Sequence, residues 1–317
     1  MLIPILLFIV GIIILYFGAD WLVDGSSQLA LRLGISPVIV GLTVVACGTS
    51  APELVASLQA QLVQGAGDVV LGNVVGSNIY NVGFILGLSA LIFPVTVHSD
   101  IIKREAPLAL FASVVMLGMM WGGVLERWEG FLLLFGFVAY ILLQVHLVRK
   151  ARSQDKLKKE YQEEIKEDKK QKISWLLFLV FLGIGSLILG AKLLIDNAII
   201  LAEHFGISQR VIGLTLVAFG TSLPELATTL VAAFKKQNDI AVANVVGSNL
   251  FNILLILGSV AAIKPIHFEA RLLHADAPFM VAVLVAMLLF ILRKKQLNRL
   301  QGGLLLTSCL IYAYFLF

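Results

Sequence analysis

Two short segments of this 317-residue chain place a glutamate just after two hydroxyl-bearing residues, inside otherwise apolar runs. The sequence GTSAPEL occupies positions 48–54, and GTSLPEL occupies positions 220–226. Carboxylate and hydroxyl oxygens are hard ligands, which Ca²⁺ and Na⁺ prefer. The candidate ligands are Thr49, Ser50 and Glu53 in the first segment, and Thr221, Ser222 and Glu225 in the second.

A proline precedes each glutamate and should interrupt the helix there. Pro52 and Pro224 have no amide hydrogen and clash with the carbonyl four residues earlier, so they should free backbone oxygens of the preceding glycine and threonine. Free carbonyls within a membrane are tolerated only when they are buried in protein or line a wet cavity. A carboxylate at that depth costs at least a few kcal/mol, which makes Glu53 and Glu225 functional candidates. The alternative is that each glutamate is protonated or ion-paired and only holds helices together; its repetition in both halves argues against this.

A second pair of blocks adds amide and hydroxyl oxygens. GNVVGSNIYN at 72–81 recurs as ANVVGSNLFN at 243–252. The predicted ligands in these blocks are Ser77, Asn81, Ser248 and Asn252, although interhelical hydrogen bonding is the alternative role. Asn78 and Asn249 are left outside the predicted site as packing or cap residues. A set made only of oxygens favours Ca²⁺ or Na⁺ and disfavours zinc and copper.

The elements that carry these residues are predicted to be transmembrane helices. Hydrophobic residues make up 59% of the chain and charged residues only 14%, against about a quarter in soluble domains. The apolar runs are continuous rather than alternating, and most approach the roughly 20 residues that cross a bilayer as a helix. The sequence therefore predicts an all-α membrane protein with ten spans, near residues 2–23, 36–63, 69–92, 107–121, 131–148, 175–195, 207–234, 240–263, 278–292 and 300–317.

A charged segment at 149–173 divides the chain into halves at 1–148 and 174–317. With ten spans, all but five of the 24 lysines and arginines fall on the same side as this linker. The positive-inside rule then places the linker in the cytoplasm and both termini outside. The net charge of +4 is explained by this topology, and it does not indicate nucleic-acid binding. The five lysines and arginines predicted on the side opposite the linker are Arg127, Lys192, Arg210, Lys264 and Arg271.

The two halves are related by an internal repeat. GISPVIVGLTVVACGTSAPEL at 34–54 recurs as GISQRVIGLTLVAFGTSLPEL at 206–226. Each half contains five predicted spans, an odd number, so the second half should be inverted in the membrane. Inverted repeats place a substrate site near the midplane of many secondary transporters. A structural duplication without transport is the alternative interpretation.

The paired GTSxPEL and GSNxxN segments resemble the α-repeats of the calcium/cation antiporter superfamily, with the closest similarity to prokaryotic sodium/calcium exchangers. The resemblance covers essentially the whole chain. It implies that Glu53, Glu225 and the backbone carbonyls of Thr49 and Thr221 bind Ca²⁺ at the centre. It further implies flanking Na⁺ sites formed by Ala46, Ser50 and Ser248 on one side and by Ala218, Ser222 and Ser77 on the other, with Asn81 and Asn252 lining the middle.

The predicted function is exchange of Ca²⁺ for Na⁺ by alternating access, in the plasma (inner) membrane of a prokaryote. A Ca²⁺/H⁺ antiporter that uses the same glutamates is the nearest alternative, and a cation channel is a more distant one. Some family members carry an acid at the position of Asn252. The asparagine at this position argues against potassium dependence. The chain lacks HExxH and GxSxG patterns, so no enzymatic function is predicted. No cofactor is predicted. The predicted partners are the transported cations and the bilayer, and the sequence leaves protein partners open.

Overall fold

The computed structural model describes residues 2–153, 171–205 and 220–316 and is mostly helical. Eight helical segments in these ranges are long and apolar enough to cross a membrane. The seventh predicted span falls partly on residues 206–219, outside the described part, and its described remainder is α13 (Leu223–Phe234). The tenth corresponds to α17 (Arg299–Leu316). The eight segments are Leu2–Leu33, Pro37–Gln64, Gly67–Ile92, Ile101–Gly122, Arg127–Arg149, Ile173–His204, Asn238–Ile263 and Leu272–Lys294.

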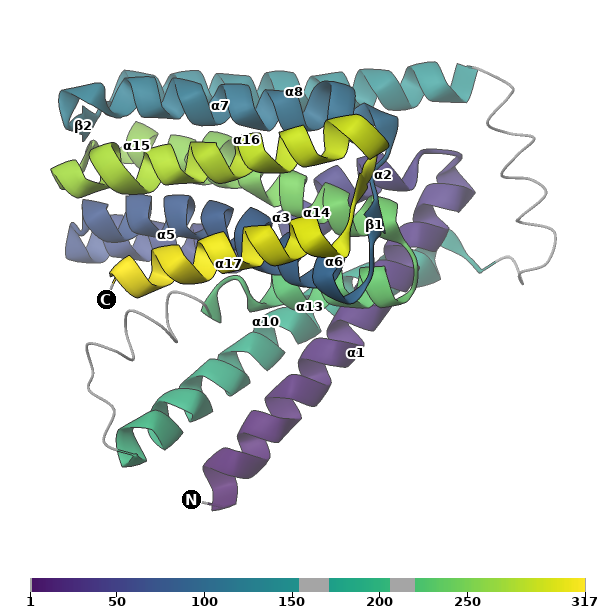
Figure 1. The fold of residues 1–317 in the computed structure, drawn as a ribbon. Helices are drawn as coiled ribbons and strands as arrows, with labels where there is room; N and C mark the ends of the chain where they lie inside the picture. Colours follow the sequence, from purple (N-terminus) through teal and green to yellow (C-terminus); the bar gives the residue numbers. More distant parts are fainter. Residues whose placement is uncertain (1, 154–170, 206–219, 317) are drawn as a thin grey trace.

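Two long helices, α1 (Leu2–Leu33) and α10 (Ile173–His204), lie side by side as a diagonal pair (Figure 1). Glycines bring their backbones together, as small residues do in membrane helix pairs. A Cβ atom on Gly183 would lie 2.8 Å from the carbonyl oxygen of Gly18 and 2.7 Å from the backbone nitrogen of Leu22. Glycine is therefore required at this crossing.

The helix that carries Glu53 is interrupted where the sequence predicts. The segment consists of α2 (Pro37–Val40), η1 (Gly41–Val45), α3 (Ala46–Thr49), α4 (Ala51–Gln59) and η2 (Ala60–Gln64). Ser50 separates α3 from α4 with φ −83° and ψ 5°, and Pro52 lies in the first turn of α4. In the second half Ser222 has φ −89° and ψ 7° and Pro224 lies in the first turn of α13. Both prolines thus start a helix directly after a break.

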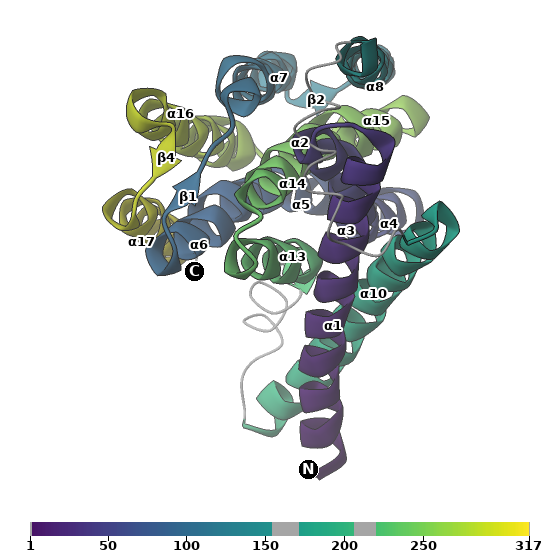
Figure 2. The same cartoon turned by 90° about the vertical axis from the view of Figure 1, so that its right-hand side faces the viewer.

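The GSNxxN blocks lie on two central helices that continue into π-helical turns. The first is α5 (Gly67–Ile79) with η3 (Tyr80–Leu86) and α6 (Gly87–Ile92). The second is α14 (Asn238–Phe251) with η7 (Asn252–Leu257) and α15 (Gly258–Ile263). In the most apolar 18-residue stretch of this second segment, 94% of the residues are buried. Figure 2 shows α5 and α14 in the interior. Because π-turns are rare and often occur at functional sites, their position at Asn81 and Asn252 is informative.

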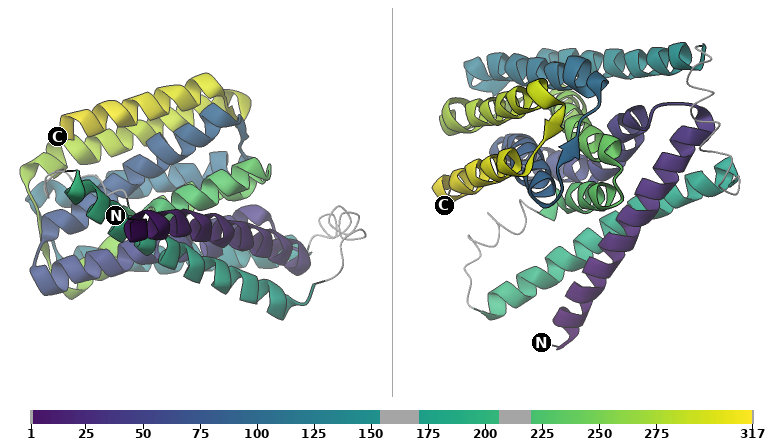
Figure 3. Two further views of the ribbon diagram at one scale, coloured as in Figure 1. Left: turned by 90° about the horizontal axis from the view of Figure 1, so that it is seen from below. Right: turned by 45° about the vertical axis from the view of Figure 1, so that its right-hand side comes forward.

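The remaining helices cover the central ones. The last two, α16 and α17, lie on the side away from α1 and α10 (Figures 2 and 3). The helix α8 continues to Ser153, so the first residues of the predicted linker extend this helix rather than leave it. The covering elements are η4 (Ile101–Glu105), α7 (Ala106–Met119), η5 (Met120–Gly122), α8 (Arg127–Ser153), η8 (Leu272–Asp276), α16 (Ala277–Lys294) and α17.

Two short antiparallel ladders join the halves, and the prediction of an all-α fold did not include them. One pairs β1 (Val95–Thr96) with β4 (Gln296–Leu297), and the other pairs β2 (Val124–Leu125) with β3 (Ile266–His267). Each ladder connects a loop of the first half to a loop of the second. Strands of two residues leave no alternating pattern in a sequence, so they could not be predicted from hydropathy.

Candidate ion-binding site

The helices that begin after Ser50 and Ser222 bring the predicted glutamates together in the interior. The Ser50 hydroxyl donates to Glu225 Oε1 at 3.1 Å, and the Ser222 hydroxyl donates to Glu53 Oε1 at 3.3 Å. Each carboxylate is therefore held by the serine of the other half. Both glutamates are 1% exposed. The sequence placed these four residues in one site, but it did not show that the contacts cross between the halves.

Other predicted ligands surround this pair. The Thr49 hydroxyl lies 3.3 Å from the Ala46 carbonyl oxygen and 3.5 Å from Ser248 Oγ. On the opposite side the Ser222 hydroxyl lies 3.2 Å from Ser77 Oγ. Thr221 contacts the site indirectly, through a hydrogen bond from its hydroxyl to an asparagine described below. The predicted residue Ala218 lies outside the described residues.

Asn81 and Asn252 belong to a closed cluster of four amides. Asn81 Nδ2 donates to Asn249 Oδ1 at 3.0 Å, and Asn252 Nδ2 donates to Asn78 Oδ1 at 3.0 Å. Asn78 Nδ2 donates to the Asn249 carbonyl, and Asn249 Nδ2 donates to the Asn78 carbonyl, both at 3.4 Å. Asn78 and Asn249, which the sequence prediction set aside, thus make direct contact with the predicted ligands. Their repetition in both blocks was the signal that could have identified them.

Two further asparagines were missed. The Thr49 hydroxyl donates to Asn244 Oδ1 at 3.2 Å, and the Thr221 hydroxyl donates to Asn73 Oδ1 at 3.4 Å. Asn73 Nδ2 also donates to the Glu53 carbonyl at 3.2 Å. Each asparagine connects its own half to the threonine of the other. Both are also repeated in the sequence, at the second position of the GNVV and ANVV segments.

Four buried oxygen atoms in this region accept no hydrogen bond from any described residue. They are Glu53 Oε2, Glu225 Oε2, Asn81 Oδ1 and Asn252 Oδ1. A buried acceptor without a partner costs about 1–3 kcal/mol, and more when it is charged. Because all four atoms are acceptors, cations bound beside them would satisfy them. The donor set therefore fits a hard cation such as Ca²⁺ or Na⁺.

The site combines two carboxylates with neutral oxygens. Within residues 2–153, 171–205 and 220–316, no group of three or more His, Cys, Asp or Glu side chains is placed to hold a metal ion.

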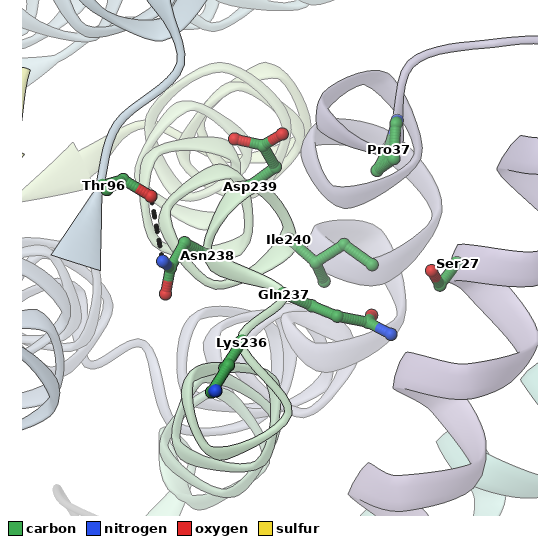
Figure 4. A pocket seen from close by; sticks show the side chains of 8 residues that line it. All are labelled: Ser27, Pro37, Thr96, Lys236, Gln237, Asn238, Asp239 and Ile240. Atoms are coloured by element: carbon green, nitrogen blue, oxygen red, sulfur yellow. Dashed lines mark hydrogen bonds between the residues drawn. The ribbon is translucent and has the colours of Figure 1, made fainter. Parts of the chain in front are cut away.

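A polar pocket of about 170 Å³ lies away from the glutamates, at the turn between α13 and α14 (Figure 4). Asn238 Nδ2 donates to Thr96 Oγ1 at 2.9 Å across it. Lys236 and Asp239 contribute charges of opposite sign to its lining, so the pocket has no clear preference for a cation. The lining residues are Ser27, Pro37, Thr96, Lys236, Gln237, Asn238, Asp239 and Ile240.

An ion-pair cluster connects α1 to the end of α13. Lys235 Nζ lies 2.6 Å from Asp20 Oδ1 and 2.7 Å from Asp24 Oδ1. Partial burial lowers the pKa of Lys235, but the hydrogen bonds to the two aspartates outweigh this and raise the pKa above its ordinary value. The two aspartates are thus paired within the protein.

The model of the family described as sodium/calcium exchanger protein matches residues 3–146 and 174–317 of this chain. The inner membrane protein YrbG of Escherichia coli (strain K12) is 41% identical over 312 residues, which cover 97% of this chain and 94% of YrbG. The sodium/calcium exchanger MaX1 of Methanosarcina acetivorans is 33% identical, and the match covers 98% of each chain.

A solved structure of the sodium-calcium exchanger NCX_Mj, soaked with 2.5 mM Na⁺ and 0.1 mM Ca²⁺, is similar to the present one. The TM-score is 0.82 at 30% sequence identity, and the match covers 98% of each chain. The sequence similarity and the structural similarity therefore both extend over nearly the entire length of the chain.

Proposed function

The chain belongs to the sodium/calcium exchanger protein family, and on this premise we propose that it exchanges Ca²⁺ for Na⁺ across the membrane by alternating access. The exchange would use a single buried site between the two halves. The observation that carries the proposal is the group of four unpaired oxygens, two of them from carboxylates. Such a group is costly to bury unless a cation occupies it for part of the cycle.

In this proposal Ca²⁺ binds between Glu53 and Glu225, with the backbone carbonyls of Thr49 and Thr221 completing the central site. The interruption of both helices at the preceding serines supports the availability of these carbonyls. Sodium ions bind on either side of the centre. One flanking site uses Ala46, Ser50 and Ser248, the other uses Ala218, Ser222 and Ser77, and Asn81 and Asn252 line the middle.

Charge balance explains how one site can serve both ions. Two carboxylates are neutralised by one Ca²⁺ or by two Na⁺, so either cargo can cross the membrane while the other is absent. Moving both carboxylates without a cation through a closed, low-dielectric state is costly. The protein should therefore return only when loaded, which makes the exchange obligatory.

The proposed architecture is ten spans in two inverted repeats, 1–148 and 174–317, joined by the linker 149–173. Reciprocal contacts support it, since each half gives its serine to the other half's glutamate and each ladder pairs one loop from each half. Inverted repeats permit the site to open first to one side and then to the other. We further propose that the linker is cytoplasmic, that both termini are outside and that the protein resides in the inner membrane.

The decisive test is uptake of ⁴⁵Ca²⁺ into proteoliposomes that contain the purified protein. Vesicles are loaded with Na⁺, with K⁺, or with K⁺ and an imposed pH gradient in Na⁺-free medium. Sodium/calcium exchange predicts uptake only into Na⁺-loaded vesicles. Uptake only with the pH gradient would instead favour the Ca²⁺/H⁺ antiporter, because protons can neutralise the same buried carboxylates. Absence of uptake in all three would overturn the assignment to calcium.

A further inference from the structure

The amide cluster contains two residues, Asn78 and Asn249, whose amide orientation is set by a hydrogen bond to a backbone carbonyl. Asn78 donates from Nδ2 to the carbonyl of Asn249 at 3.4 Å and accepts at Oδ1 from Asn252 Nδ2 at 3.0 Å. Asn249 donates to the carbonyl of Asn78 at 3.4 Å and accepts from Asn81 Nδ2 at 3.0 Å. Both side chains are buried, with 1% and 2% exposure.

These bonds fix which end of each amide faces which neighbour. A backbone carbonyl can only accept a hydrogen bond, so Asn78 must direct its nitrogen to the carbonyl of Asn249. The oxygen of Asn78 then faces Asn252, which must direct its own nitrogen toward it. The oxygen of Asn252 is consequently the atom left without a described donor. In the same way, Asn249 directs its nitrogen to the carbonyl of Asn78 and its oxygen to the nitrogen of Asn81, so the oxygen of Asn81 is left without a described donor.

We infer that Asn78 and Asn249 are positioning residues that lock the amides of Asn252 and Asn81 with oxygen, rather than nitrogen, available to the transported cation. The inference rests on the proposed function. Neither residue needs to touch the ion. An amide that turned over would present its partly positive NH₂ group to the cation, so the lock raises the affinity of the site for cations.

The test is equilibrium binding of ⁴⁵Ca²⁺ to purified protein, because binding can be measured whichever counter-ion drives transport. Asn78→Ala and Asn249→Ala, each compared with wild type, should raise the Kd for Ca²⁺ by about tenfold or more, as loss of orienting partners does at other metal sites. The matched control is Asn197→Ala. Asn197 is also a buried asparagine, and its Nδ2 donates to the Leu193 carbonyl at 2.7 Å, but it lies on α10 outside the site. Its substitution should leave the Kd unchanged.

A double-mutant cycle separates positioning from general loss of structure. If Asn78 acts through the oxygen of Asn252, then Asn78→Ala combined with Asn252→Ala should bind Ca²⁺ no more weakly than Asn252→Ala alone. Additive effects, an unchanged Kd in both single variants, or loss of monodisperse protein in both would overturn the inference. A wild-type protein that binds Ca²⁺ without Na⁺-driven uptake would refute only the proposed exchange, whereas one that binds no Ca²⁺ would refute both.

Discussion

At the residue scale, the two glutamates carry the negative charge of the proposed site, and the surrounding serines, threonines and asparagines would supply neutral oxygens. Ser50 and Ser222 each satisfy one oxygen of a carboxylate and leave the other unpaired. The serines thus orient the glutamates without neutralising them. Selectivity for charge should therefore reside in Glu53 and Glu225, while the neutral residues determine geometry.

Replacing either carboxylate by an amide should abolish Ca²⁺ transport. Glu53→Gln or Glu225→Gln leaves one negative charge against a divalent ion and introduces an NH₂ group at the site. We expect the affinity for Ca²⁺ to fall by about 100-fold or more, since ligand charge strongly affects binding of this ion. Uptake of ⁴⁵Ca²⁺ into Na⁺-loaded vesicles, with purified protein matched by size-exclusion profile, measures the effect.

Glu129→Gln provides the control for these substitutions. Glu129 is 7% exposed, and its carboxylate accepts a hydrogen bond from the Glu126 amide at 2.8 Å at the start of α8, outside the site. Glutamine keeps an oxygen for this bond, so uptake should stay near the wild-type rate. Full transport by either Glu53→Gln or Glu225→Gln would exclude the proposed site.

The candidate ligand residues could be singled out from the sequence because they are repeated in both halves. The sequence did not predict the orienting asparagines, because their role depends on partners in the opposite half. Asn78 pairs with Asn249 and Asn252, which are distant in sequence, and which end of an amide faces a neighbour leaves no trace in composition. Ala218 and the ligand roles themselves remain predictions.

At the element scale, the breaks at Ser50 and Ser222 followed from proline chemistry and are present. The π-turns that begin near Asn81 and at Asn252 were not predicted, since a π-turn in an apolar run has the same hydropathy as an α-turn. The extension of α8 to Ser153 was also not predicted, because charged residues at the end of a helix resemble a linker. Hydropathy locates the apolar part of a helix, not its ends.

Packing of α1 against α10 gives a prediction for Gly183→Ala. The added Cβ would lie within 2.8 Å of backbone atoms of α1, which cannot move aside as a flexible side chain can. We expect a loss of about 1–3 kcal/mol in stability, typical of overpacking. Thermal unfolding of the detergent-solubilised protein, followed by tryptophan fluorescence, measures it.

Gly185→Ala is the matched control on the same helix. No described atom lies within 4 Å of a Cβ built there, and alanine favours a helix more than glycine does. Its melting temperature should equal or slightly exceed that of the wild type. Equal losses in both variants would mean that the contact between Gly183 and α1 does not control the result.

The ion pairs of Lys235 give a second prediction at this scale. Lys235→Met leaves Asp20 and Asp24 near each other without a counter-charge, which should lower the melting temperature by about 2–4 °C at low salt. The difference should shrink in 1 M salt because the cluster is partly exposed. Lys264→Met, which removes a contact with the Gln61 carbonyl instead of a carboxylate, should show no such salt dependence.

The pH dependence of this cluster follows from the raised pKa of Lys235. A lysine whose pKa is higher in the folded state contributes its full stabilisation below its ordinary value of about 10.4 and loses it as pH rises through the raised value. The difference between wild type and Lys235→Met should therefore be constant near neutral pH and vanish only in strong alkali. A difference that disappeared between pH 6 and 8 would contradict this assignment.

At the scale of the whole molecule, the resemblance inferred from the paired motifs is confirmed by the family match over both halves. The orientation is still a prediction and can be tested with reporter fusions. Alkaline phosphatase fused after Phe317 should be active, because the terminus is expected outside, whereas phosphatase fused within the linker at Gln162 should be inactive. A green fluorescent protein at each position should give the reverse pattern. Matching signals at both positions would require an even number of spans after the linker and would contradict the inverted repeat.

The proposed obligatory exchange also belongs to the scale of the whole molecule, since it would depend on both halves closing around the same two carboxylates. Vesicles loaded with ⁴⁵Ca²⁺ should release it into medium that contains Na⁺ or unlabelled Ca²⁺ at least about tenfold faster than into choline medium, because an empty site with two buried charges returns slowly. A cation channel would release the label at comparable rates into all three media when the membrane potential is clamped with K⁺ and valinomycin. Rapid release into choline medium would therefore reject exchange. Slow release into choline medium that becomes fast when Na⁺ is added outside would show that the return step requires a bound ion.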